Sequence, residues 1–140
     1  MSNFSVSPLK KASKKLKEGL NFYQANPQEI IRDGLIKRFE FTYEISHKIL
    51  KRFLKNISAN SEQFDTMSFA DLIRAANKQN LLRNNWQNWK KYRDMRNKTS
   101  HIYDENIADA IVAEIPEFLD EIEFLLARIT ERCDDGSDNG

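Results

Sequence analysis

Apolar side chains recur through most of this sequence at intervals of three and four residues, the spacing of helices with one buried face. The first apolar stripe runs from Leu9 to Leu20 and follows Ser7-Pro8, a pair typical of helix starts. A longer stripe runs from Ile31 to about Ile57 and follows residues 26–29, in which Glu29 lies three residues after a candidate Asn cap. This second stripe predicts the longest helix and the spine of a helical bundle.

The second half of the chain predicts three further helical segments. Ser68-Phe69-Ala70-Asp71 has the form of a capping box and opens a short helix that should fade at Asn80. Asn84-Asn85 precedes a helix from Trp86 to Arg96, with large aromatic side chains along one face. A last apolar pattern continues from Ile107 to Arg132.

Composition agrees with an all-α fold, expected here as an up-and-down bundle of four to five helices. Hydrophobic residues make up 40% of the chain and charged residues 31%, with only four Gly and three Pro. The length suits a single domain, assigned to residues 1–133, followed by a flexible acidic tail at 134–140. Pro116 interrupts the last apolar pattern and predicts either a kink or two segments that meet at Glu114 and Ile115.

Features often tied to metals, disulfides or export are sparse in this sequence. The single Cys133 cannot form an internal disulfide, and no apolar run near the start resembles a signal peptide or a membrane span. His47 lies off the centre of its apolar stripe and is expected at the core boundary or the surface. We therefore expect a cytoplasmic protein with no metal site and no cofactor.

The formal net charge of +1 hides an uneven distribution. Residues 104–140 carry twelve acidic side chains against two arginines, a net charge of −10, which leaves +11 for residues 1–103. A basic body attracts nucleic acid or nucleotide phosphates, whereas solvated helix faces that differ only in sign are an equally good interpretation. Trp86 and Trp89 likewise either stack bases or pack inward, and inward packing is favoured.

The residues that point to chemistry lie between Met95 and Tyr103. Arg96 is permanently cationic, His101 can exchange a proton near neutral pH, and Tyr103 adds a phenol two residues later. Because Arg96 and His101 are five residues apart, their side chains would point about 140° apart on an unbroken helix. Either a helix break near residues 98–100 or a second copy of the site across a symmetric dimer is needed to make one pocket.

In such a pocket, the planar fork of Arg96 can bind a phosphodiester at two points and stabilise the charge that grows at phosphorus. His101 would take or give a proton. Attack by the neighbouring ribose 2′-hydroxyl needs no metal ion, and this requirement points to RNA as the substrate. The structural alternative is that Arg96 pairs with a carboxylate while His101 ends a helix.

The run Arg-Asn-Lys-Thr-Ser-His-Ile-Tyr at residues 96–103 resembles the Arg-x4-His-x-Tyr signature of HEPN-superfamily toxins. Residues 34–44, residues 71–76 and Trp89 are similar to the HepT-like branch, long described as nucleotidyltransferase substrate-binding subunits. This resemblance implies a HEPN-like homodimer with two motifs around one cleft. It also implies a metal-independent endoribonuclease toxin in which Arg96 and His101 are catalytic and Asn97 positions the substrate.

The resemblance further implies a partner, a minimal nucleotidyltransferase that acts as antitoxin by transferring AMP to Tyr103. A second interpretation is a non-catalytic subunit that uses the same cleft to hold a nucleotide or substrate for a separate nucleotidyltransferase, with Arg96 binding phosphate. In a third, the motif only caps a helix of a structural bundle. Loss of RNA cleavage on changing His101 to Ala, with helix content intact, would separate the first interpretation from the other two.

Overall fold

The computed structural model describes the backbone of residues 4–138 and the side chains of residues 4–133, and within these limits every regular element is helical. Five α-helices follow one another: α1 (Ser7–Ala25), α2 (Glu29–Ile57), α3 (Phe69–Lys78), α4 (Trp86–Asn97) and α5 (Glu105–Asp138). Two short 3₁₀ helices, η1 (Ser61–Asp65) and η2 (Thr99–His101), lie in the connections before α3 and α5. The predicted all-α class is confirmed.

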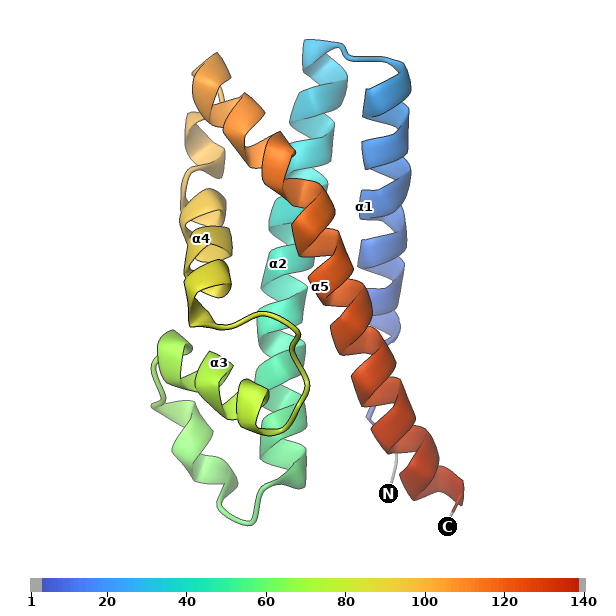
Figure 1. The fold of residues 1–140 in the computed structure, drawn as a ribbon, viewed down its shortest axis with the longest axis vertical. Helices are drawn as coiled ribbons and strands as arrows, with labels where there is room; N and C mark the ends of the chain where they lie inside the picture. The colour runs from blue at the N-terminus through green and yellow to red at the C-terminus, as the bar shows by residue number, and fades with distance from the viewer. Residues whose placement is uncertain (1–3, 139–140) are drawn as a thin grey trace.

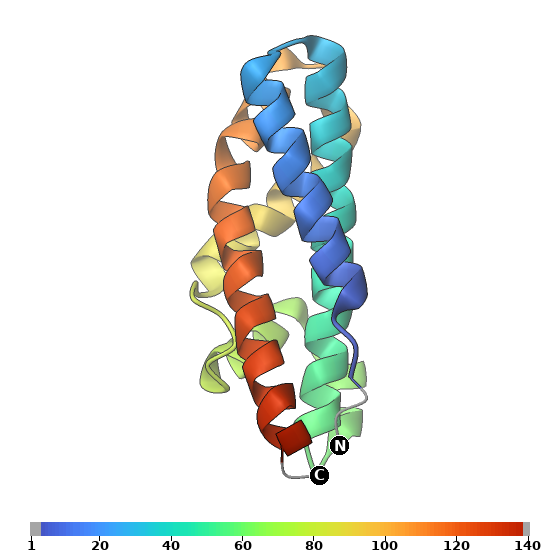
Figure 2. The same ribbon diagram turned by 90° about the vertical axis from the view of Figure 1, so that its right-hand side faces the viewer.

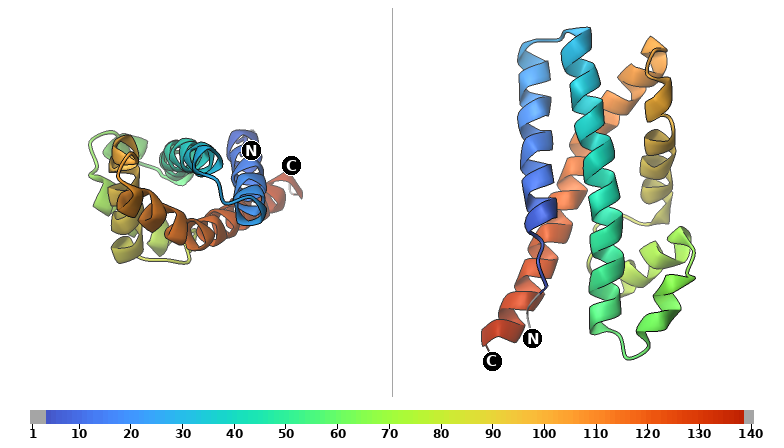
Figure 3. Two further views of the ribbon diagram at one scale, coloured as in Figure 1. Left: turned by 90° about the horizontal axis from the view of Figure 1, so that it is seen from above. Right: turned by 180° about the vertical axis from the view of Figure 1, so that it is seen from behind.

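The four longer helices alternate in direction, so that α1, α2, α4 and α5 form an up-and-down arrangement (Figure 1). Helices α1 and α2 pack along each other, and α5 crosses both at an angle, while short α3 lies across the end of α2. Seen from behind, α2 lies between α1 and α4 (Figure 3). Both ends of the described chain lie at one end of the bundle (Figure 2), and the α4–α5 junction lies at the other.

Most helix boundaries follow the expected local signals. Ser68 Oγ accepts a hydrogen bond from the backbone N of Asp71 at 3.1 Å, as a capping box requires, and Asn85 Oδ1 accepts from Gln87 N at 3.0 Å at the start of α4. Helix α2 ends at Ile57, as its apolar stripe predicts. The expected cap by Asn26 is wrong, because Gln28 is the residue that precedes α2 and no side chain caps this end.

Helix α5 is one continuous element with Pro116 inside it, so the alternative of two segments meeting at Glu114 and Ile115 is wrong. Burial explains the continuity, because Ile115 and Phe118 on either side of the proline are both fully buried in the bundle. The backbone of α5 extends to Asp138. The expected flexibility of residues 134–140 stays a prediction, since the side chains from 134 onward and residues 139–140 lie outside the described residues.

The centre of the bundle is aromatic, and its edge-to-face packing brings α2, α4 and α5 together. Phe118 of α5 lies 4.9 Å from Phe39 of α2 and 5.1 Å from Tyr92 of α4, measured between ring centroids. Trp89 is fully buried and lies 5.3 Å from Tyr92, which confirms that this tryptophan packs inward. These contacts fix α4, and with it the residues that follow its last turn.

A buried carboxylate joins the segment before α4 to α5. Glu121 is 0% exposed and accepts hydrogen bonds from the backbone N of Arg83 and of Asn84 at 2.8 and 2.7 Å. The indole Nε1 of Trp89 donates to the same carboxylate at 3.1 Å. Burial raises the pKa of Glu121 above its usual range, while these three donors oppose that shift.

At the opposite end of α4, Arg32 of α2 holds the beginning of α5. Its side chain is buried and forms ion pairs with Glu105 and Asp109 of α5 at 3.8 and 3.3 Å. Burial opposes the charge of Arg32, but the neighbouring carboxylates more than compensate and raise its pKa. These ion pairs therefore hold the start of α5, two residues after Tyr103, against α2. Within the described residues, no helix is both long enough and apolar enough to span a membrane.

Candidate functional site

The chain changes direction between Arg96 and Tyr103, at the junction of α4 and α5. Helix α4 ends at Asn97, and residues 99–101 form the single turn of η2, stabilised by a hydrogen bond from His101 N to Lys98 O at 2.9 Å. Asp104 then caps α5, because its Oδ1 accepts from Asn106 N at 2.9 Å. The predicted helix break near residues 98–100 is confirmed.

Arg96 is held by two carboxylates from α2. Its Nε donates to Glu44 Oε2 at 2.9 Å, and its Nη2 donates to the same oxygen. Glu40 Oε2 lies 3.5 Å from the same Nη2. The hydrogen bond to Glu44, followed by the charges of Glu44 and Glu40, raises the pKa of Arg96 and keeps it cationic.

His101 and Tyr103 form a second pair, on the solvent side of the turn. His101 Nδ1 lies 3.3 Å from Tyr103 Oη, and both side chains are exposed, Tyr103 to 82%. Ile102 between them is partly buried and packs against the core, which points its neighbours outward. Among the described contacts none joins Arg96 to His101, so one protomer presents two separate pairs and not a closed catalytic pair.

An open cavity of about 300 Å³ lies beside Arg96, between α2 and the turn. It is lined by residues from both elements: Asp33, Ile36, Lys37, Glu40, Arg96, Thr99, Ser100 and Ile102. Lys37 and Arg96 contribute positive charge, Asp33 and Glu40 contribute negative charge, and Lys37 pairs with Glu40 at 3.3 Å. We call this space the junction cavity. Its lining is therefore mixed in charge, and Arg96 is the cation that lies nearest the turn in sequence.

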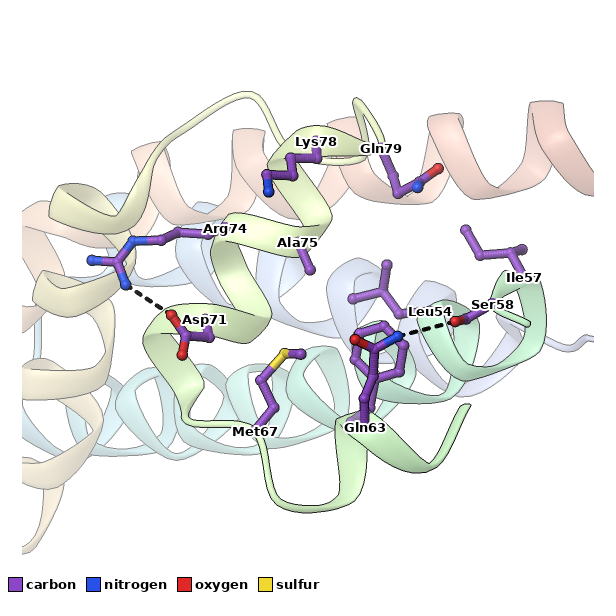
Figure 4. Close-up of a pocket in the computed structure, with 11 residues that line it drawn as sticks. Leu54, Ile57, Ser58, Gln63, Met67, Asp71, Arg74, Ala75, Lys78 and Gln79 are labelled. Carbon is purple, nitrogen blue, oxygen red and sulfur yellow. Dashed lines mark hydrogen bonds and ion pairs between the residues drawn. The ribbon is translucent and has the colours of Figure 1, made fainter. Parts of the chain in front are cut away.

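A larger cavity, of about 490 Å³, opens at the opposite end of the bundle between α2, η1 and α3 (Figure 4). Its base is apolar, with Leu54, Phe64 and Met67, and its rim carries the Asp71–Arg74 ion pair at 3.0 Å. It shares no residue with the Arg96–Tyr103 segment. Cavity size alone would thus have directed attention away from the motif.

Asn97, the last residue of α4, is exposed, and its role in positioning substrate stays a prediction. His47 is partly buried against the ring of Phe69, with 4.6 Å between centroids, which agrees with the boundary position expected for it. In the described part of the chain, no group of three or more His, Cys, Asp or Glu residues could hold a metal ion.

Glu40, Glu44 and Lys37 belong to the site but are not among the residues predicted for it. The pairing of Glu44 with Arg96 joins residues 52 positions apart, and a single sequence does not show such pairs. One signal was available, because Glu40 and Glu44 are four residues apart within the 34–44 stretch that carries the family resemblance. Two acidic residues on one helical face would also suit an arginine partner.

The fold and the junction define a class of protein: an all-α bundle that presents Arg-x4-His-x-Tyr where α4 turns into α5. The chain belongs to the nucleotidyltransferase substrate-binding-protein-like family, whose model matches residues 4–131. It is 38% identical over 115 residues to a protein of Haemophilus influenzae named probable ribonuclease HepT, covering 80% of this chain and 78% of that one. The HepT-like assignment expected from the motif is confirmed.

Two solved structures share this fold. One, from Haemophilus influenzae, is described as revealing the fold of a substrate binding domain of a nucleotidyltransferase; it has a TM-score of 0.82 and 34% identity, covering 90% of this chain and 99% of that chain. The other, from Thermus thermophilus, has a TM-score of 0.73 and 31% identity, covering 86% and 98% respectively. Membership in this family implies a nucleotidyltransferase as partner.

Proposed function

We propose that this chain is a metal-independent endoribonuclease, the toxin of a toxin–antitoxin pair. The observation that carries the proposal is the α4–α5 junction, where a cationic Arg96 borders an open cavity and His101 stands exposed five residues later. The name of the 38% identical relative, probable ribonuclease, supports the same reaction class. RNA and the partner protein would meet this site in the cytoplasm.

The reaction is an internal transfer at phosphorus. The ribose 2′-oxygen bonds to the adjacent phosphorus as its proton passes to a histidine, and the bond from phosphorus to the 5′-oxygen breaks. The leaving 5′-oxygen takes up a proton, so the products are a 2′,3′-cyclic phosphate and a 5′-hydroxyl. Arg96 stabilises the charge that develops on the phosphoryl oxygens. Asn97, beside Arg96, would position the substrate.

A homodimer completes this scheme. Within one protomer, Arg96 and His101 take part in separate contacts. A symmetric pairing of two protomers at the junction would place two motifs around one cleft. One His101 could then act as base and the other as acid. The exposed apolar side chains of Ile30 and Phe41 on α2, 78% and 58% exposed, support an interface on this side of the bundle.

Control by the partner would act at Tyr103. Its exposed hydroxyl can accept AMP from ATP, with pyrophosphate released, through a minimal nucleotidyltransferase that acts as antitoxin. Because Tyr103 Oη lies 3.3 Å from His101 Nδ1, the added phosphodiester would stand beside the imidazole and repel RNA phosphate. Intact-mass measurement after co-expression with the partner tests this step, and a Tyr103→Phe variant that still gains the mass of AMP would reject Tyr103 as the acceptor.

The proposed activity is tested by comparing two histidine variants on RNA. His101→Ala should lower cleavage about 1,000-fold or more with unchanged helix content, because general acid–base catalysis supplies 10²–10⁴-fold. His47→Ala is the matched control, since His47 packs on Phe69 away from the junction, and it should cut at close to the parental rate. Equal cleavage by His101→Ala and the parent would reject the assignment.

A second candidate is a non-catalytic subunit that holds a nucleotide for a separate nucleotidyltransferase. The family description and the account given of the Haemophilus structure favour it, since both refer to substrate binding. Here Arg96 and Lys37 would bind phosphate in the junction cavity. Nucleotide affinity that is lost in Arg96→Ala, in a protein without ribonuclease activity, would select this candidate.

A further inference from the structure

The guanidinium of Arg96 is held along one edge only. Arg carries five N–H donors, one on Nε and two on each terminal nitrogen. Glu44 Oε2 accepts from both Nε and Nη2, and Glu40 lies near Nη2 as well. Within the described residues no hydrogen bond or ion pair reaches Nη1. The Nε/Nη2 edge of the guanidinium is therefore occupied, while the N–H donors of Nη1 remain available.

Contact along one edge fixes the orientation of the Arg96 guanidinium. A carboxylate oxygen that accepts from both Nε and Nη2 fixes the plane of the guanidinium and removes the rotation of the last side-chain bonds. A phosphate in the junction cavity would then meet donors already in place and would not have to order a free side chain, which costs about 0.5–1.5 kcal/mol for a long one. Glu44 belongs to α2, and the buried face of α2 holds that helix in the core.

From this arrangement we propose that Glu44 is the positioning residue of the site. Its carboxylate holds the Nε/Nη2 edge of Arg96 so that the Nη1 edge remains available to a phosphate group in the junction cavity. Glu44 touches neither substrate nor reacting atoms in this proposal, and it acts through Arg96. The inference rests on the proposed function, because it assigns a role within the same phosphate-binding site.

A competing effect acts in the opposite direction. A carboxylate beside a phosphate site also repels the phosphate, so removing Glu44 could strengthen binding. Two variants separate the effects. Glu44→Ala and Glu44→Gln both remove the charge, but only glutamine keeps a side-chain oxygen that can accept from Nε and Nη2. The difference between the two variants therefore reports positioning, with charge repulsion held constant.

The first measurement is steady-state RNA cleavage by the full chain. Glu44→Ala should lower kcat about 10- to 100-fold with a smaller change in KM, as expected when a catalytic group loses its orientation. Glu44→Gln should recover most of that loss. Glu18→Ala on the exposed face of α1 removes the same side chain away from Arg96 and should leave kcat unchanged. Thermal unfolding midpoints should agree within about 4 °C, because the ion pair is partly exposed.

The second measurement does not require cleavage. A 2′-O-methyl RNA oligonucleotide lacks the attacking hydroxyl and reports binding alone, for instance by fluorescence anisotropy. Glu44→Gln should bind it about threefold more tightly than Glu44→Ala, from the ordering cost of one long side chain. Arg96→Ala should abolish the difference between glutamine and alanine at position 44, since no guanidinium remains to be oriented.

The outcomes are distinct. Equal kcat and equal binding for Glu44→Ala and Glu44→Gln would overturn the positioning role. So would a Glu44→Ala variant that cuts faster than Glu44→Gln, which would make the contact inhibitory. If the parent cuts no RNA, the ribonuclease proposal fails by itself, and the oligonucleotide comparison still decides whether Glu44 orients Arg96.

Discussion

Helix α4 carries a polar cluster at each end, and the two differ in how their polar groups are satisfied. The inner cluster consists of Asn84, Trp89, Tyr92, Glu117 and Glu121, and it joins the start of α4 to α5. The outer cluster consists of Arg96, His101 and Tyr103, at the α4–α5 junction. Both clusters contain aromatic side chains and side-chain hydrogen bonds. The inner cluster contains carboxylates, and the outer cluster contains an arginine that binds one.

In the inner cluster the polar groups face one another. Glu121 accepts three hydrogen bonds, and Tyr92 Oη both donates to Glu117 Oε1 and accepts from Asn84 Nδ2, each at 3.2 Å. Burial comes first among the causes that raise the pKa of Tyr92, followed by the charge of Glu117. Trp89, Tyr92 and Glu121 are buried, whereas Asn84 is partly buried and Glu117 is exposed. Because the members of this network pair with one another, the network stabilises one arrangement of the helices.

In the outer cluster, donors and acceptors face solvent. The Nη1 group of Arg96 has no partner among the described residues, and His101 and Tyr103 are exposed. Exposed groups with spare hydrogen-bonding capacity contribute little to stability but can bind a ligand. Changes in the inner cluster should therefore alter stability without altering the chemistry, and changes in the outer cluster should alter the chemistry without altering stability.

Glu121→Ala should give the largest effect on stability. It leaves the backbone N of Arg83, the backbone N of Asn84 and Trp89 Nε1 without their acceptor in the interior, at a total cost of about 3–5 kcal/mol. Urea unfolding measures the loss. Asp120→Ala, at the exposed neighbouring position, should change the free energy of unfolding by less than about 0.5 kcal/mol. A loss below about 1 kcal/mol in Glu121→Ala would contradict the role given to the inner cluster.

Arg96→Ala should have the reverse profile. Removing the cation that stabilises the transition state should lower kcat/KM for RNA about 100- to 1,000-fold. The free energy of unfolding should change by less than about 1 kcal/mol, because the ion pairs of Arg96 are partly exposed. Both quantities are measured on the same preparation. A large loss of stability with normal cleavage would place Arg96 among the structural residues.

The sequence predicted most of the fold because helices leave local signals. Apolar spacing located the end of α2 at Ile57, and the polar run after Arg96 indicated the break that ends α4 at Asn97. Pro116 misled because proline disfavours a helix interior locally, whereas the buried neighbours of Pro116 stabilise the helix through tertiary packing. Local patterns thus predict where helices lie. They do not predict where tertiary packing overrides a strong local signal such as a proline.

The candidate site was only half visible from the sequence. Arg96, His101 and Tyr103 lie within eight residues and match a known motif, so they could be selected directly. Glu121 could not be selected, and the only signal for Glu44 was its four-residue spacing from Glu40, because each acts on groups more than 30 residues away. Of these two, one is fully buried and the other holds the candidate catalytic arginine. Their roles depend on helix packing, which no local pattern encodes.

Tyr92→Phe and Tyr103→Phe make the same chemical change in the inner and the outer cluster. The first removes a hydroxyl with two partners and should cost about 1 kcal/mol of unfolding free energy, measured in urea. The second removes an exposed hydroxyl and should leave stability within about 0.5 kcal/mol. Equal stability of the two variants would mean that the inner network contributes no more than the outer one.

The last prediction is a pH dependence of stability that comes from His47. Burial against Phe69, followed by the charge of Lys51, lowers the pKa of His47, so the folded state binds this proton less readily than the unfolded chain. The stability that depends on a neutral His47 is fully present above the ordinary histidine pKa near 6.5 and decreases as the pH falls below it. Unfolding free energies measured between about pH 5 and 7.5 should therefore rise with pH, and His47→Phe should flatten that rise. A slope that is unchanged in His47→Phe would show that another titrating group causes it, and would contradict the effect assigned to the burial of His47.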